Sequence, residues 1–179
     1  MSKRNLCVFC GSRLGKDPDF KNAAIQVADF MAKGGWDLVY GGGSVGLMGV
    51  IADQALTNGC KVTGVIPHYI HELEVGHSAL SETIFTEDMQ TRKALMAEKS
   101  DAFLILPGGF GTLDELFEFA ALSQLNQHQK PLVLFNQKGF YDPLVAQIQI
   151  MESQDFLNSE TAGIIKEAKS VTEIFQILS

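Results

Sequence analysis

The chain has 179 residues, of which 46% are hydrophobic and 20% charged, and its formal net charge is −7. This length and composition are typical of one globular domain, so we expect residues 1–179 to form a single domain and exclude a largely disordered chain. The acidic balance argues against a nucleic-acid partner, because a surface that binds nucleic acid carries a basic stripe. No run approaches the ~20 apolar residues of a membrane span, so we expect no membrane partner.

Short apolar runs alternate with longer helical patterns from end to end. The first expected strand, residues 6–10, precedes a helix that Asp17 caps, Pro18 opens and Gly34-Gly35 ends. Further strands are expected at 37–40, 62–66, 83–86, 102–106, 132–135 and 164–166, and further helices at 44–57, after Asp88, at 113–126, at 141–154 and at 171–178. This alternation predicts an α/β fold with a Rossmann-like, doubly wound parallel sheet and helices on both faces. In such sheets ligands bind beyond the carboxyl ends of the strands, at a topological switch point.

The three cysteines give an odd count with no disulfide framework. Cys7 and Cys10 lie three positions apart in the first expected strand, which places them on opposite faces and argues against a shared metal. We expect reduced core thiols, as suits a cytoplasmic protein. The N-terminal apolar run is also too short for a signal peptide.

Glycines follow the first two strands. Gly11-Ser12 permits a tight turn into a ligand crevice, and a structural turn and a phosphate contact are equally compatible with it. The segment 41–49 has three consecutive glycines, which a plain connector rarely needs because they are costly in backbone entropy. It is not a Walker loop, since no Lys-Ser or Lys-Thr follows, and it lies after the second strand rather than the first, where a dinucleotide fingerprint would stand. We favour a nucleotide or phosphate loop of another kind over a purely structural turn.

Two polar segments follow the next strands. His68, His71 and His77 have no recognisable metal-ligand spacing, and their segment follows Pro67 as an expected loop, so we expect no metal site. In the helix after Asp88, Arg92 and Lys93 form either a solvated face or a contact to phosphate or carboxylate, for which arginine is the better suited.

The most informative segment is 106–115, Leu-Pro-Gly-Gly-Phe-Gly-Thr-Leu-Asp-Glu. It joins an expected buried strand to a helix, so its glycines let backbone approach a ligand while the helix start offers unpaired N–H groups to an anion. Glu115 adds a carboxylate one turn inside that helix. A phosphate cradle beside an acid suggests chemistry on a nucleotide.

The helix expected at 113–126 carries apolar residues around most of its circumference. A chain of this size has limited interior in which to bury such a helix. We therefore expect burial against a second subunit, in a homodimer.

Taken together, the segment 41–49, the Met89-x-x-Arg92-Lys93 pattern and the motif 107–115 resemble the LOG ("lonely guy") family. These are cytokinin riboside 5′-monophosphate phosphoribohydrolases, once labelled possible lysine decarboxylases. The resemblance runs from Val8 to about Asp155. The decarboxylase label implies pyridoxal phosphate, but no lysine here has a convincing Schiff-base context.

The resemblance implies hydrolysis of the N-glycosidic bond of a nucleoside 5′-monophosphate, with no metal or redox cofactor. It gives Glu115 and Arg92 catalytic roles: the carboxylate stabilises oxocarbenium-like charge on the ribose and orients water, while Arg92 holds the nucleotide. The expected ligand contacts are Gly11, Ser12, Gly42, Gly43, Glu74, Met89, Lys93, Gly108, Gly109, Phe110, Gly111 and Thr112.

The chain departs from the family's usual pattern in residues 120–126 and at one separate position, Gln90. Ala121 stands where some members have a substrate-contacting threonine, Gln90 replaces a common histidine, and Asn126 replaces a usual glycine. AMP-like and prenylated nucleotides therefore both remain candidate substrates. The altered stretch also motivates an alternative, a nucleotide-binding or sensor protein without turnover.

Overall fold

The computed structural model describes residues 3–73 and 76–179. Its centre is a seven-stranded sheet in which all neighbouring strands are parallel, in the order β4-β3-β2-β1-β5-β6-β7. The strands are β1 (Arg4–Phe9), β2 (Trp36–Tyr40), β3 (Val62–Pro67), β4 (Glu82–Thr86), β5 (Ala102–Ile105), β6 (Leu132–Phe135) and β7 (Ile165–Ala168). The predicted Rossmann-like α/β fold is confirmed.

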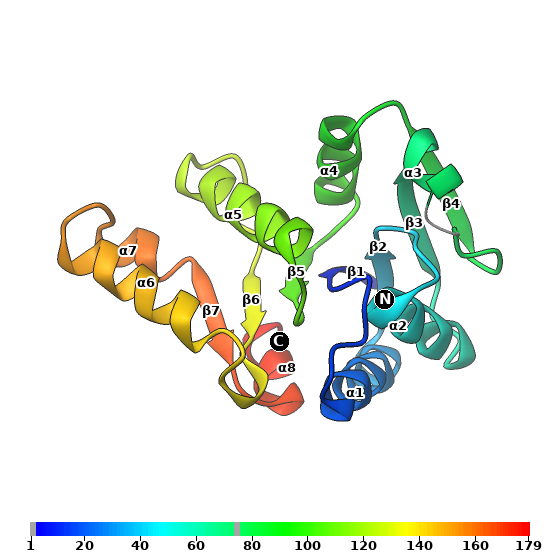
Figure 1. Cartoon of the computed structure of the whole chain (residues 1–179), viewed down its shortest axis with the longest axis horizontal. Coiled ribbons are helices and arrows are strands. Elements are labelled where there is room, and N and C mark those ends of the chain that lie inside the picture. The colour runs from blue at the N-terminus through cyan, green and yellow to red at the C-terminus, as the bar shows by residue number, and fades with distance from the viewer. Residues whose placement is uncertain (1–2, 74–75) are drawn as a thin grey trace.

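Helices cover both faces of this sheet (Figure 1). The helices of the described chain are α1 (Pro18–Gly34), α2 (Gly46–Thr57), α3 (His68–Leu73), α4 (Met89–Glu98), α5 (Phe110–Gln124), α6 (Asp142–Ser153), α7 (Ser159–Ala162) and α8 (Val171–Ile177), with a 3₁₀ turn η1 (Gln137–Gly139). None of them is both long and apolar enough to cross a membrane.

Local sequence explains the boundaries of α1. The Asp17 carboxylate accepts a hydrogen bond from the Asp19 backbone N–H at 2.9 Å, and Pro18 occupies the first turn. Gly35 ends the helix in the left-handed conformation, with φ of 70°. Both signals were readable in the sequence, because a side-chain cap and a terminal glycine satisfy the unpaired groups at helix ends.

The strands separate two cores. On one face they pack against α1, α2 and α8, and on the other against α4, α5 and α6 (Figure 1). Cys10 belongs to the first core and Cys7 to the second, which confirms that the two thiols lie on opposite sides of the sheet. Strand β5 is buried on both sides, and a fully buried side chain such as Phe103 contributes about 1.5–3 kcal/mol.

Two sequence predictions need correction, and one helix was not predicted. The segment after Pro67 is not a loop, because His68–Leu73 forms the short helix α3. The helix expected at 113–126 begins earlier, at Phe110, and ends at Gln124, since Asn126 has a positive φ of 56° that a right-handed helix does not allow. A further short helix, α7, was not anticipated.

The strand order creates a switch point between β1 and β5. From β1 the chain winds outward through β2 to β4, then crosses back to β5 on the other side of β1. The segments that follow these two strands diverge to opposite faces, α1 to one and α5 to the other. A crevice at the carboxyl ends of β1 and β5 is the expected position for a ligand.

Candidate functional site

A cavity of about 300 Å³ lies at this switch point. Segments after β1 and β5 form part of its wall, and α4 and α5 supply most of the rest. The sequence-predicted residues that line it are Gly11, Ser12, Met89, Arg92, Gly109, Phe110, Gly111, Thr112 and Glu115. Three segments far apart in the chain, near 11, 92 and 110, are thus brought together as the sequence predicted.

Glu115 and Arg92 face one another inside this cavity. Arg92 Nη2 lies 3.7 Å from Glu115 Oε1, and the two side chains are only 10% and 11% exposed. This separation is longer than a direct hydrogen bond. The pair is close enough for strong electrostatic coupling, yet both groups keep hydrogen-bonding capacity that a ligand can use.

Burial sets the protonation behaviour of the acid. Desolvation raises the pKa of the Glu115 carboxyl to about 7, the neighbouring Asp114 and Glu118 carboxylates add to the rise, and the Arg92 and Lys93 cations oppose it. A carboxyl group with a pKa near neutrality exchanges protons readily at physiological pH. Such perturbed groups in clefts are typical of catalytic acids and bases.

The Arg92 guanidinium is held by packing more than by hydrogen bonds. Its Nη1 lies 3.5 Å from Met89 Sδ, and its buried Nε has no hydrogen-bond partner in the part of the chain that is described. Gly41 provides the surface on which it rests, because a Cβ atom at that position would collide with Arg92 Nη2. A buried, unpartnered donor of this kind is costly unless a ligand satisfies it.

The start of α5 forms the second chemical element of the site. Gly109 is its N-cap residue, and no side chain caps it. A Cβ at Gly109 or Gly111 would meet no atom within 4 Å, so both backbones border open space. Gly108 is different, since a Cβ there would collide with the Thr112 side chain and come within 3.0 Å of the Gly11 backbone N. Free N–H groups and the helix dipole make this first turn suited to a phosphate.

Lys93 lies beside the cavity rather than in its wall. Its Nζ contacts Asp114 Oδ2 at 3.0 Å and also pairs with Glu118, so it ties α4 to α5. Burial lowers the pKa of Lys93, but hydrogen bonds to Glu118 and Asp114 outweigh this effect and leave the pKa above its ordinary value. In this arrangement the ammonium group is already neutralised by two carboxylates.

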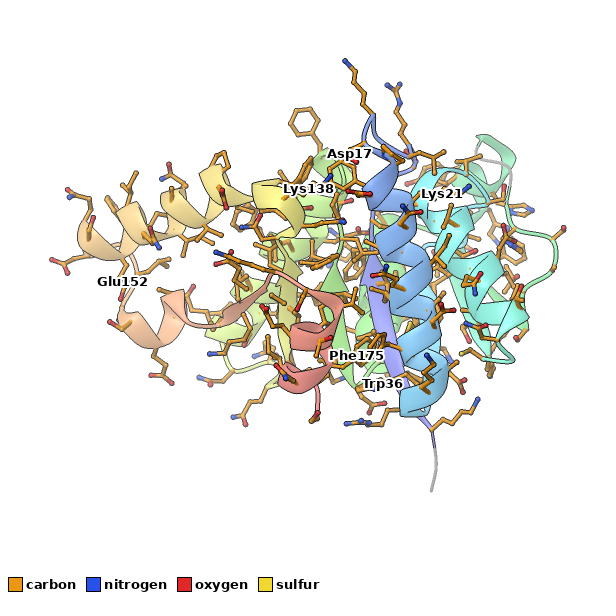
Figure 2. All side chains as sticks on the ribbon, turned by 90° about the horizontal axis from the view of Figure 1, so that it is seen from below. Asp17, Lys21, Trp36, Lys138, Glu152 and Phe175 are labelled. Atoms are coloured by element: carbon orange, nitrogen blue, oxygen red, sulfur yellow. The ribbon has the colours of Figure 1, made fainter. Side chains whose placement is uncertain are left out.

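A second cavity, of about 340 Å³, adjoins the first through Gly11, Ser12 and Gly109. Its other walls include Gly108 and the rings of Phe20 and Phe140. Lys138, in η1, pairs with Asp17 at the start of α1, and this bond joins the two segments that carry the rings (Figure 2). We call the first cavity, which contains Arg92 and Glu115, the polar chamber; the second cavity beside it is more apolar.

Two of the remaining predicted contacts, Gly42 and Gly43, line neither cavity. Gly42 and Gly43 bond to the segment after α3: Gly42 O accepts from His77 N at 3.0 Å, and Gly43 forms a bridge with Gly76. Glu74 falls outside the described residues. No group of three or more His, Cys, Asp or Glu side chains in the described ranges could hold a metal ion.

Four residues of the polar chamber were not among the predicted contacts: Cys10, Met48, Ile70 and Asp114. Cys10, Met48 and Asp114 each adjoin or belong to a motif that was recognised, so their position was accessible from the sequence. Ile70 was missed because it lies on α3, in the segment expected to be a loop.

Comparisons with known proteins identify the relatives of this chain. A family model described as "Possible lysine decarboxylase" matches residues 48–178. A probable cytokinin riboside 5′-monophosphate phosphoribohydrolase of Oryza sativa subsp. japonica is 44% identical over 96% of this chain and 77% of its own length. A cytokinin riboside 5′-monophosphate phosphoribohydrolase of Arabidopsis thaliana is 41% identical over 98% of this chain and 82% of its own.

Among solved structures, the molybdenum cofactor binding protein of Rippkaea orientalis has a similar fold. Its TM-score is 0.73 at 24% identity, and the match covers 99% of this chain and 96% of that one.

Proposed function

Since the chain belongs to the LOG family, whose members include the cytokinin riboside 5′-monophosphate phosphoribohydrolases, we propose that it hydrolyses the N-glycosidic bond of a nucleoside 5′-monophosphate. The products are the free base and ribose 5-phosphate. The observation that carries this proposal is the buried Glu115 carboxylate facing Arg92 at 3.7 Å, beside the uncapped start of α5. No observation favours a sensor without turnover, which would have no need of this buried pair.

The start of α5 and the Glu115–Arg92 pair have separate roles in the proposed reaction. The first turn of α5, with the open backbones of Gly109 and Gly111, binds the 5′-phosphate. Phosphate binding at this turn places the ribose near Glu115, which lies in the second turn of the same helix. The helix itself therefore fixes the distance between the phosphate site and the acid, an entropic advantage for the reaction.

The carboxylate acts on the charge that develops as the bond breaks. Loss of the base leaves oxocarbenium-like positive charge on the ribose, which the ionised Glu115 stabilises at close range in a site of low dielectric. Water adds to C1′, the C1′–N bond breaks, and a proton passes to the departing base. Arg92 favours the ionised form of Glu115 against the effect of burial and satisfies its own free donors on the nucleotide.

Decarboxylation with pyridoxal phosphate does not fit these residues. That cofactor needs a lysine able to form a Schiff base. Among the described residues, no lysine lines the polar chamber. The nearest along α4 is Lys93, whose raised pKa and two carboxylate partners keep it protonated and non-nucleophilic.

We further propose that the protein is a cytoplasmic homodimer that uses the outer face of α5. Phe117 is 41% exposed on this helix, Phe110 is 94% exposed at its start, and Leu125, which follows its last residue, is 67% exposed. Phe117 also lines an apolar groove between α5 and α6 that includes Ile148 and Met151. A second copy of the chain would cover this surface, consistent with the apolar circumference of the helix.

The proposed activity is tested by incubating the protein with AMP and, separately, with isopentenyladenosine 5′-monophosphate. Free base and ribose 5-phosphate are then measured by chromatography. Equal amounts of both products are expected from at least one nucleotide. A matched control is Glu152→Gln, which removes a carboxylate from α6, a helix that lines neither cavity. Glu152 lies away from α1 (Figure 2), and the substitution is expected to leave the rate unchanged. Nucleotide-dependent thermal stabilisation without any free base would instead identify a binding protein.

A further inference from the structure

His77 lines neither cavity. Its side chain is only 8% exposed, and both of its ring nitrogens make hydrogen bonds. Its Nδ1 accepts a hydrogen bond from the Ala79 backbone N–H at 3.2 Å. Since Nδ1 accepts, Nε2 carries the proton in the neutral ring and donates to Asp53 Oδ1 at 3.0 Å. Asp53 belongs to α2, so the ring connects the segment after α3 to that helix.

The backbone of the same residue binds the glycine loop. His77 N donates to Gly42 O, and the adjacent Gly76 pairs with Gly43. His77 therefore closes a ring of contacts. Its backbone bonds Gly42 at one end of residues 42–53, and its side chain bonds Asp53 at the other end. On its other side the loop lies against β3, where a Cβ at Gly64 would come within 2.9 Å of Gly42 Cα. The glycine loop is thus clamped between β3 and residues 76–77.

The clamped loop is also the surface on which Arg92 rests. Gly41 precedes Gly42 and lies directly against Arg92 Nη2, with no room for a Cβ. Since the guanidinium has few protein hydrogen bonds of its own, its position depends on where this backbone lies. A small shift of Gly41 therefore moves Arg92 relative to Glu115.

We infer that His77, through its bond to Asp53, is a positioning residue that fixes the glycine loop and thereby the Arg92 guanidinium for catalysis. This inference rests on the proposed function for its kinetic test. It assigns His77 no contact with the nucleotide. This positioning role is separate from phosphate binding, because the proposed phosphate site is the first turn of α5, whereas His77 lies in the segment after α3.

The kinetic test compares His77→Ala, Asp53→Ala and the double variant. Misplacing a catalytic group by about 1 Å can cost 10²-fold in rate, and a partial shift should cost about tenfold. We expect each single variant to lower kcat about tenfold with KM changed less than twofold. The kcat of the double variant should fall no further than that of either single variant, because all three variants remove the same hydrogen bond.

Two further variants separate positioning from general stability. His77→Gln retains a donor near the position of Nε2 and should keep most of the wild-type kcat. His128 makes a comparable pair of hydrogen bonds, in which Nε2 donates to the Phe119 carbonyl oxygen at 2.9 Å and Nδ1 accepts from the Lys130 N–H. This residue lies beyond the C-terminal end of α5, whereas the site is at the N-terminal end. His128→Ala should lose stability to urea by a similar amount while keeping kcat.

A readout independent of activity follows Arg92 directly. Its buried, unpartnered Nε–H should give a resolved NMR signal, assigned by its loss in Arg92→Lys. The signal should shift in His77→Ala and Asp53→Ala but not in His128→Ala. An unmoved signal overturns the inference, as does a wild-type kcat in His77→Ala or an additive loss in the double variant. If the wild-type protein releases no base, the proposed function fails while the NMR comparison still decides the role of His77.

Discussion

Replacing Glu115 with Gln should make the protein more stable at alkaline pH, although the acid is expected to be essential for activity. The substitution keeps the shape of the side chain and removes its charge. Burial raises the pKa of the carboxyl from its ordinary 4.5 to about 7, so the folded protein binds this proton more tightly than the unfolded chain does. The stability associated with the protonated acid is present below the unfolded pKa and is lost as pH rises toward the folded pKa.

The magnitude follows from the same two values. One pKa unit corresponds to 1.36 kcal/mol, so the rise from 4.5 to about 7 is equivalent to about 3 kcal/mol. At pH 4 the acid is protonated in the folded protein and mostly protonated in the unfolded chain, so its titration should add little to the stability difference between wild type and Glu115→Gln. At pH 8 the variant should be more stable by up to about 3 kcal/mol, since it no longer buries a charge.

The assay is urea unfolding of both proteins at pH values from 4 to 8. The quantity of interest is the difference in the free energy of unfolding between the two proteins at each pH, because other titrating groups cancel in that difference. Glu152→Gln on α6 serves as a control whose difference from wild type should stay nearly constant. A Glu115→Gln difference that is independent of pH, or a wild-type protein that is the more stable at pH 8, would refute the reasoning.

Three further predictions follow from named contacts. Arg92→Ala removes the cation that opposes the rise in the Glu115 pKa, so the acidic limb of kcat/KM should move to higher pH; an unmoved limb would show that the two groups are not coupled. Gly41→Ala places a Cβ against Arg92 Nη2 and should lower kcat about tenfold in a base-release assay, and wild-type activity would contradict the packing described. Phe117→Asp introduces a charge on the exposed face of α5 and should convert the proposed dimer to a monomer in size-exclusion chromatography with light scattering, whereas a wild-type protein that is already monomeric at micromolar concentration would refute the proposed dimer.

The sequence predicted the strands closely because their signals are local. Residues 132–135 form β6 as expected, and the other six strands differ from expectation by only one or two residues at either end. Asp17, Pro18 and Gly35 marked the ends of α1 through their own backbone and capping chemistry. The order of the strands carries no such local signal, since it depends on how crossovers pack around the sheet.

Helices with weak local signals were harder to predict. Helix α5 begins at Phe110 although Gly111 lies in its first turn, because the tight packing of Gly108 against Thr112 and Gly11 fixes the entry of the chain. Glycine has a poor intrinsic helix propensity, which placed the expected start three residues too late. Helix α3 has six residues and too little apolar periodicity to be distinguished from a loop.

The candidate site was predictable as a set of motifs but not as a network. Arg92, Glu115 and the glycines after β5 meet in one cavity because each follows the carboxyl end of a parallel strand. The partners of Lys93 were not predictable, because its bonds to Asp114 and Glu118 depend on the register between α4 and α5. Adjacent cations in a sequence can therefore have separate tasks, one in the cavity and one between helices.

The central claim is that the buried Glu115 carboxylate cleaves the glycosidic bond of a nucleotide that the start of α5 holds by its phosphate. It is tested most directly by comparing wild-type protein and Glu115→Gln under single-turnover conditions, with base release and nucleotide affinity measured on the same samples. The account predicts that Glu115→Gln binds the nucleotide with an affinity close to that of the wild type and releases no detectable base. Base release by Glu115→Gln at the wild-type rate would contradict it.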